Sequence, residues 1–109
     1  MQSLLCNIRD ALTSIKDLKV YHYWRTREEA PYCVWQEESE GDSLHTGNHK
    51  TEQVITGTID YFTKTEYDPI VDSIQDALNT VENLGWKLDS VSYEDDTGLI
   101  HYSWDWEIA

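Results

Sequence analysis

The segment LIHYSWDWEI (99–108) alternates apolar and polar side chains with a period of two. Such alternation is typical of an antiparallel strand with one face in the core and the other in solvent. A slip of one residue would bury Asp105 and Glu107, so the pattern also sets the register of the strand. We therefore predict a sheet in which these side chains share the buried face: Ile100, Tyr102, Trp104, Trp106 and Ile108.

Two other segments carry apolar residues at helical spacing. The first is predicted to begin with Ser3 as the N-cap and to end near Leu18. In the second, Asp68 is placed as the N-cap, Pro69 as the first helical residue, and Gly85 as the residue that closes the helix.

Segments rich in aromatic and β-branched residues predict four more strands, at about 20–25, 31–38, 52–63 and 86–94. Gly57 lies in the middle of the third and indicates a bulge or a close approach by another backbone. The polar segment from 38 to 50 reads as a loop or an extended excursion. The order αβββαββ, with short links, favours an α+β fold: a mostly antiparallel sheet with two helices packed on one face, in a single domain over 1–109.

The charge balance excludes several classes of function. With 21 acidic and 8 basic residues the net charge is −13, which leaves too few cations for a duplex DNA interface, so we expect no sequence-specific nucleic-acid binding. No apolar run approaches the roughly 20 residues that span a bilayer, so no membrane partner is expected. The first residues reach charged side chains too early for a secretory signal, which favours the cytoplasm.

Motifs for catalysis or cofactor binding are absent from the sequence. It contains no glycine-rich phosphate loop, no nucleophile elbow and no C-x-x-C pair. His45 and His49 have the spacing of a helical metal pair, but Gly47 between them disfavours a helix. Cys6 and Cys33 are interpreted as small apolar residues. We expect no enzyme activity, no cofactor and no metal.

The aromatic residues instead predict a surface for assembly. Strands 20–25 and 31–38 carry aromatic residues on both faces, which is expected of a strand that is central in the fold or buried against a partner. The polar segment after them could form a second contact. The candidate assembly surface comprises Tyr21, Tyr23, Trp24, Tyr32, Trp35, Glu38, Glu40, Asp42, Leu44 and His45.

Between the first helix and the closing hairpin lie three phrases of the chain: APYCVWQEE, KTEQVITGTIDYFTKT and YDPIVDSIQDALN. Together these elements resemble the tail-terminator (tail-completion) proteins of long-tailed bacteriophages. The resemblance covers nearly the whole chain. It rests on the order of elements, with its closest local matches at 31–35 and 53–65. The acidic run at 37–42 has no counterpart in this pattern.

The resemblance implies a structural protein of the virion, assembled in the host cytoplasm. Such proteins form a hexameric ring at the head-proximal end of the tail tube, stop tube growth and join the tail to the head. The implied partners are further copies of the chain, the tail-tube protein and a head-completion protein, and in isolation such a chain can remain monomeric. An acidic lumen would let DNA slide through the ring.

Three other interpretations are compatible with the sequence. The first is an acidic inhibitor that mimics DNA and blocks a basic partner. The second is a neighbouring head–tail joining component of the same virion. The third is a small enzyme or ligand-binding domain, which a deep pocket with converging polar groups would favour.

Overall fold

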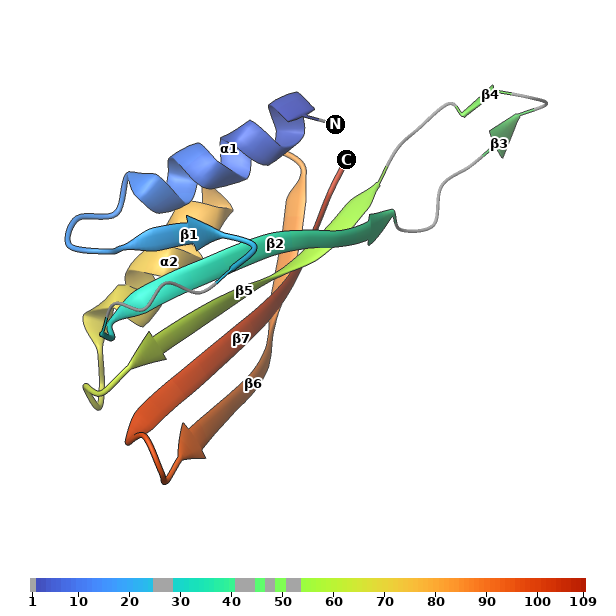
Figure 1. The fold of residues 1–109 in the computed structure, drawn as a ribbon. Coiled ribbons are helices and arrows are strands. Elements are labelled where there is room, and N and C mark those ends of the chain that lie inside the picture. The colour runs from blue at the N-terminus through green and yellow to red at the C-terminus, as the bar shows by residue number, and fades with distance from the viewer. Residues whose placement is uncertain (1, 25–28, 41–44, 47–48, 51–53) are drawn as a thin grey trace.

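The computed structural model describes residues 2–24, 29–40, 45–46, 49–50 and 54–109. Five strands form one sheet in the order β1-β2-β5-β7-β6, and both helices lie on the same face of it (Figure 1). The predicted α+β fold is confirmed. The elements are α1 (Gln2–Thr13), β1 (Val20–His22), β2 (Tyr32–Glu40), β5 (Ile55–Thr63), α2 (Pro69–Asn79), β6 (Leu84–Glu94) and β7 (Leu99–Ile108).

All neighbouring strands of the sheet are antiparallel except one pair. β1 runs parallel to β2, with Val20 opposite Cys33. Between β2 and β5 the chain makes an excursion that contains a second, two-stranded sheet of β3 (His45–Thr46) and β4 (His49–Lys50). The segment predicted as a loop or extended excursion therefore begins later than expected, because β2 continues to Glu40.

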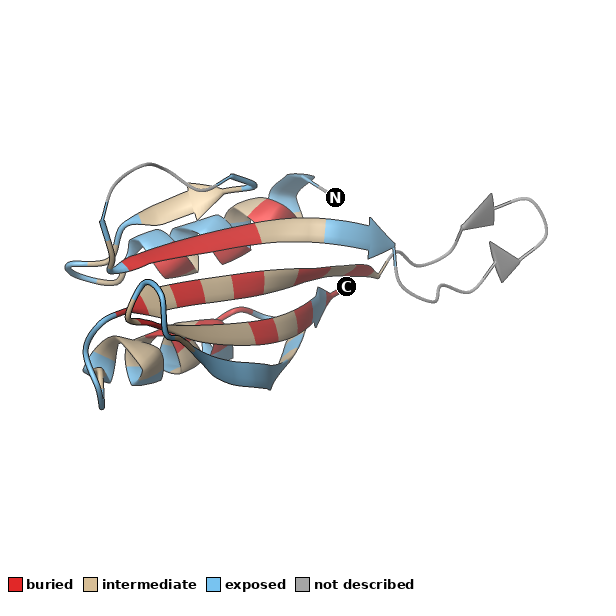
Figure 2. Ribbon diagram, turned by 60° about the horizontal axis from the view of Figure 1, so that its bottom comes forward, coloured by how far each residue is buried: buried red, intermediate tan, exposed pale blue. Residues whose placement is uncertain are grey.

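The core lies between the helices and the sheet, and the central strands show the expected alternation (Figure 2). Every second residue of β5 is buried, from Ile55 to Thr63. Trp104 lies opposite Ile59 and is fully buried, and its indole N–H donates to Oε1 of Gln75 in α2 at 3.1 Å. The predicted register of the closing strand is confirmed, since its buried residues include Trp104, Trp106 and Ile108.

Gly57 combines both of the features expected of it. The pairing of β2 with β5 shifts between Glu37 and Ser39, directly beside Gly57, which marks a bulge. A Cβ atom at Gly57 would lie 2.1 Å from the carbonyl oxygen of Gln36 and 2.3 Å from Cζ2 of Trp106. Trp106 thus packs directly onto the backbone of β5, and only glycine leaves room for it.

The predicted ends of the helices and of the first strand need correction. α1 already includes Ser3, so Ser3 is not its N-cap, and it ends at Thr13, several residues before Leu18. α2 ends at Asn79, and Gly85 lies in β6 because the chain turns into the strand earlier. A residue other than glycine, Asn83, takes the left-handed backbone conformation there, with φ 63°.

The aromatic strand predicted over 20–25 is also shorter in the structure. β1 ends at His22, and Tyr23 adopts a φ of 76°, which is incompatible with an extended strand.

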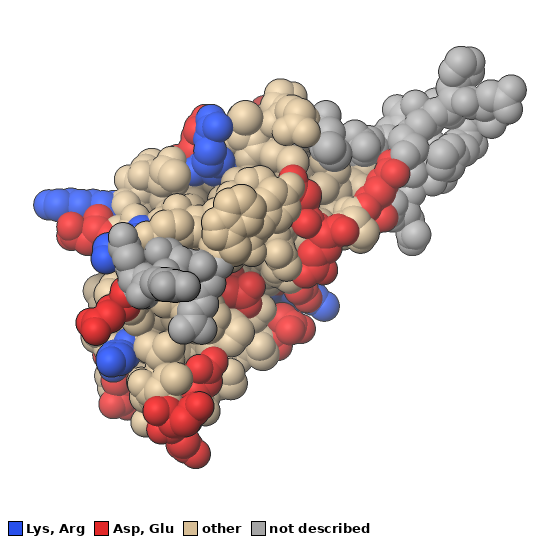
Figure 3. Space-filling model, in the orientation of Figure 1, with Lys and Arg blue, Asp and Glu red and all other residues tan. Residues whose placement is uncertain are grey.

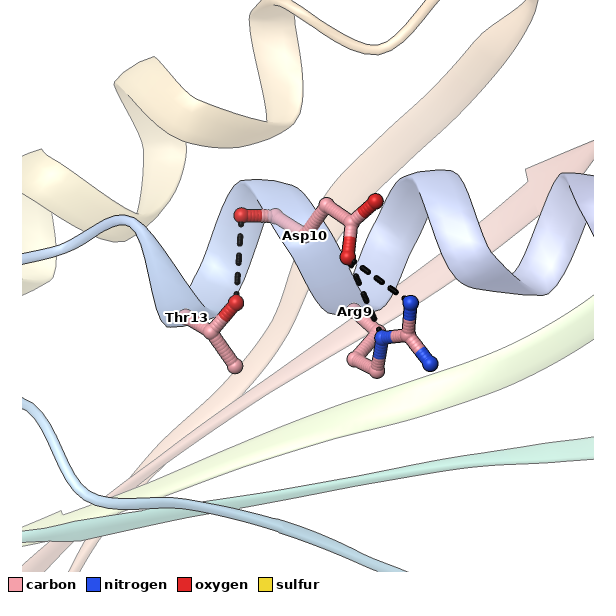
Figure 4. A network of polar contacts seen from close by, with 3 residues as sticks. All are labelled: Arg9, Asp10 and Thr13. Carbon is pink, nitrogen blue, oxygen red and sulfur yellow. Dashed lines mark hydrogen bonds and ion pairs between the residues drawn. The ribbon is translucent and has the colours of Figure 1, made fainter.

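The outer side of α1 carries a local polar network (Figure 4). Arg9 donates two hydrogen bonds to Oδ1 of Asp10, at 3.0 and 3.1 Å, and the hydroxyl of Thr13 donates to the Asp10 carbonyl oxygen. The hydrogen bond from Arg9 to the Asp10 carboxylate raises the pKa of the exposed Arg9 guanidinium. All three residues are exposed, so this face of α1 stays hydrated. The ion pair between Arg9 and Asp10 therefore adds little to the stability of the fold.

Asp68 connects the start of α2 to the end of β5. Its Oδ1 accepts a hydrogen bond from the backbone N–H of Ile70 at 2.9 Å, which confirms the predicted N-cap. Its Oδ2 accepts from the hydroxyls of Tyr61 and Thr63, both at 2.7 Å. Burial alone would raise the pKa of Asp68, but these hydrogen bonds to the carboxylate outweigh it and lower the pKa.

Replacing Asp68 by alanine is expected to lower the free energy of unfolding by about 2–4 kcal/mol. The loss combines a helix cap worth about 1 kcal/mol with about 1–3 kcal/mol for hydroxyls left unpaired. Since the carboxylate pKa is lower in the folded chain, its contribution is present at neutral pH and decreases as the pH falls through that pKa. Denaturant titration from pH 7 to pH 3 measures this effect. Asp68→Asn keeps a capping oxygen, so it should lose less stability and lose the pH dependence.

Candidate assembly surface

An aromatic stack projects from the end of β1. The ring of His22 lies on the buried ring of Trp35, with centroids 4.0 Å apart and planes 9° apart. Tyr23 stacks on the other side of His22 at 3.8 Å, and Trp24 follows at 6.1 Å. Tyr23 is 47% exposed and Trp24 72% exposed. We call these two residues the aromatic tip; it is exposed to solvent while its base is anchored in the core.

Glu37 of β2 holds the rings of His22 and Tyr23, at the base of the aromatic tip. Its Oε1 lies 2.6 Å from Nε2 of His22, and its carboxylate also accepts a hydrogen bond from the hydroxyl of Tyr23. Burial acts to raise the pKa of Glu37, but hydrogen bonds from its own backbone, Tyr23 and His22 outweigh it, and the pKa is lowered. The same hydrogen bond raises the pKa of Tyr23. At neutral pH the carboxylate is therefore ionised and holds both rings in place.

The ten predicted surface residues divide into four groups. Tyr23 and Trp24 are exposed, as expected, and Tyr21 is partly exposed. Glu38 and Glu40 are exposed on the last part of β2. Tyr32 and Trp35 are buried inside the chain, so they are removed from the candidate surface. Asp42 and Leu44 lie outside the described residues, as does the side chain of His45, whose backbone forms part of β3.

Tyr32 and Trp35 are buried because the chain covers both faces of β2 by itself. Trp35 faces the helices and belongs to the main core. On the opposite face, Tyr32 stacks on Phe62 at 4.9 Å and Phe62 stacks on His101 at 4.2 Å. His101 is held by Oδ1 of Asp60 at 2.7 Å. Aromatic residues on both faces of this strand therefore contact other parts of the same chain.

An open groove of about 650 Å³ runs across the end of the sheet away from the β6–β7 turn. The groove crosses four strands. Several of the side chains that line it lie on the face of the sheet opposite the helices. The indole N–H of Trp106 is buried beside it and has no hydrogen-bond acceptor among the described residues. The groove is lined by Glu38, Thr56, Gly57, Gly85, Trp86, Lys87, Asp105, Trp106 and Glu107.

Acidic side chains predominate on the molecular face shown in Figure 3. They gather over the far end of β2 and at the turn between β6 and β7 (Figure 3). The groove itself carries Glu38, Asp105 and Glu107 against the single cation Lys87. Phosphate would be repelled from such a surface, whereas a cationic group would be accepted.

One exposed apolar surface was missed by the sequence prediction. Leu88, Val91 and Tyr93 of β6 are 44%, 51% and 63% exposed. Val91 and Tyr93 alternate with serines, which resembles an ordinary half-buried strand. No local signal shows that the helices end before they reach these residues.

The described part of the chain holds neither a cluster of metal-binding side chains nor a membrane-spanning helix. No group of three or more His, Cys, Asp or Glu residues comes together there. Among the helices described, none is both long and apolar enough to cross a bilayer.

Compared with known protein families and with curated proteins, the chain matches no family model and shows no significant similarity to any of those proteins.

Proposed function

We propose that this chain is a phage or prophage tail-terminator protein, which forms a ring at the head-proximal end of the tail tube, stops tube growth and joins the tail to the head. The observation that carries the proposal is the aromatic tip, Tyr23 and Trp24, which is exposed while Tyr23 stacks on His22 and hydrogen-bonds to Glu37. Exposed aromatic side chains with a fixed geometry are typical of protein interfaces.

A ring requires two unlike surfaces on each subunit, because its contacts are heterologous. The aromatic tip is one such surface, and the groove across the end of the sheet is the other. The groove is open, includes Trp86 and two glycines, and is rimmed by carboxylates. In the proposed ring the tip of one subunit seats in the groove of the next.

The negative charge of the chain supports the passage of DNA through such a ring. With a net charge of −13 the subunit has no surplus of cations with which to bind phosphate. A lumen lined by carboxylates would repel the duplex and let it slide during ejection.

A nonsense mutation in the gene tests the proposal directly. The expected phenotype is DNA-filled heads together with unattached tails of irregular length, seen by negative-stain electron microscopy. Complementation with Trp24→Ala should fail to restore joined particles, although the purified variant should melt within a few degrees of the wild type, since Trp24 is exposed. Tyr67→Ala, also at an exposed aromatic residue, is the matched control and should restore them.

Normal tails joined to heads in the nonsense mutant would reject the tail-terminator function. The acidic-inhibitor alternative would then be preferred, supported by the carboxylates of the groove, Glu38, Asp105 and Glu107. That alternative expects a stable complex with a basic protein, and a charge-reversed Asp105→Lys variant should weaken the complex.

A further inference from the structure

The sheet has two edges of very different length. At one edge β1 has three residues and is followed at once by the aromatic tip. At the other edge β6 has eleven residues, and in the described structure it pairs with β7 alone. A long edge strand presents a row of backbone N–H and C=O groups that can pair with another strand.

The helices cover only the beginning of β6. Leu84 and Trp86 pack against the core, whereas Leu88, Val91 and Tyr93 stay exposed. The reason is geometric: a helix of eleven residues spans about 16 Å, and a strand of the same length spans about 36 Å. The second half of β6 therefore carries apolar side chains beyond the reach of α2.

A bulge keeps these apolar residues on one face. Leu88 lies opposite Trp104 and Ser90 opposite Ser103, so Asp89 is an extra residue outside the pairing. After it, Val91 pairs with Tyr102 and shares the helix-side face with Leu88. The helix-side face of the strand thus shows Leu88, Val91 and Tyr93, and the opposite face shows Lys87, Ser90, Ser92 and Glu94.

We propose that β6 pairs antiparallel with β6 of a second copy of this chain, with the two-fold axis at Val91. In that register Val91 meets Val91, Leu88 meets Tyr93, Ser90 meets Ser92 and Lys87 meets Glu94. Every opposed pair shares a face, its apolar residues meet apolar residues, and the lysine meets a carboxylate. Opposed apolar pairs and opposed unlike charges each stabilise an antiparallel pair.

Neighbouring registers lose the pairing of Lys87 with Glu94. An axis at Ser92 would place Leu88 opposite Asp95, outside the strand. An axis at Ser90 would place Glu94 opposite Gly85 and leave Lys87 opposite a serine. The pairing of Lys87 with Glu94 therefore selects the axis at Val91. Both side chains lie on the face of the strand opposite the helices, so they can meet in this register.

This pairing differs in symmetry from the contacts of the proposed ring, although Lys87 takes part in both surfaces. It is isologous, with the same strand from both copies, whereas a ring contact joins two unlike surfaces. It occupies the long edge of the free chain and so prevents that edge from pairing with other strands. The inference does not rest on the tail-terminator function, and either can fail without the other.

The native mass and a charge reversal test the pairing. Sedimentation of the purified chain should give a dimer of about twice 12.7 kDa. Lys87→Glu should increase the dissociation constant at least tenfold by opposing it to Glu94, and adding Glu94→Lys should restore most of the affinity. A monomeric wild-type chain, or a double variant as weak as the single one, would overturn the proposal.

Cross-linking tests the position of the axis. In a Cys6→Ser background, Val91→Cys brings two thiols opposite each other, at the 4.5–5.5 Å Cα separation of opposed residues that a disulfide can bridge. Tyr93→Cys is the matched control, because in the same register its two copies lie about 14 Å apart along the strands. Mild oxidation should cross-link the Val91 variant and spare the Tyr93 variant. Equal cross-linking of both, or of neither, would contradict the axis at Val91.

Discussion

Replacing Trp104 by alanine is expected to destabilise the chain by about 3–5 kcal/mol. Trp104 has no exposed surface, lies opposite Ile59 at the centre of the sheet, and donates its indole N–H to Gln75 of α2. The substitution removes the contact between sheet and helix and leaves a cavity that neighbouring strands cannot close. For a domain of this length the loss is a large part of the total stability. Urea unfolding followed by circular dichroism measures it.

Trp24→Ala provides the matched control for this measurement. It deletes the same side chain from a position that is 72% exposed, so the free energy of unfolding should change by less than about 1 kcal/mol. Equal losses for the two tryptophans would mean that the closing strand does not have the register described here.

Gly57→Ala is expected to cost about 3 kcal/mol or more, although it adds one methyl group. The new Cβ atom would overlap the carbonyl oxygen of Gln36 and the ring of Trp106. The first of these is backbone in the neighbouring strand, so no side-chain rotation relieves the overlap and the bulge must shift. The melting temperature should fall by roughly 4–8 °C for each kcal/mol of stability that is lost, and thermal unfolding measures this fall.

Gly85→Ala is the control for the loss of a strand glycine. A Cβ atom at Gly85 would have its nearest neighbour, the side chain of Glu107, at an ordinary contact distance of 3.7 Å. The residue is exposed and has no positive φ, so the variant should be as stable as the wild type or slightly more so. A tolerated Gly57→Ala would show that Trp106 does not pack on β5 as described.

The features that the sequence predicted well depend on neighbours along the chain. The face on which Trp104 and Trp106 lie follows from alternation within one strand, and the start of α2 follows from Asp68 and Pro69. Gly57 was identified because glycine in a strand usually marks a close approach or a bulge. Each of these signals lies within a few residues and needs no knowledge of what packs above it.

The helix ends, the shortened first strand and the role of Gly85 depended on longer-range geometry. α2 stops at Asn79 and Asn83 takes the left-handed conformation, because the chain must turn there to enter β6. Glycine is the residue most favoured in a left-handed turn after a helix, but in this chain Asn83 occupies that position because the connection to β6 turns there.

For the candidate assembly surface, the aromatic composition can be read from the chain, whereas the exposure of each side chain depends on how the elements pack. Aromatic residues on both faces of β2 are compatible with a partner, yet Tyr32 is buried beside Phe62 of the next strand and Trp35 lies in the core. Val91 and Tyr93 alternate like half-buried residues but stay exposed. Burial depends on how far a short helix reaches along a longer strand, and that length is set only when the elements pack.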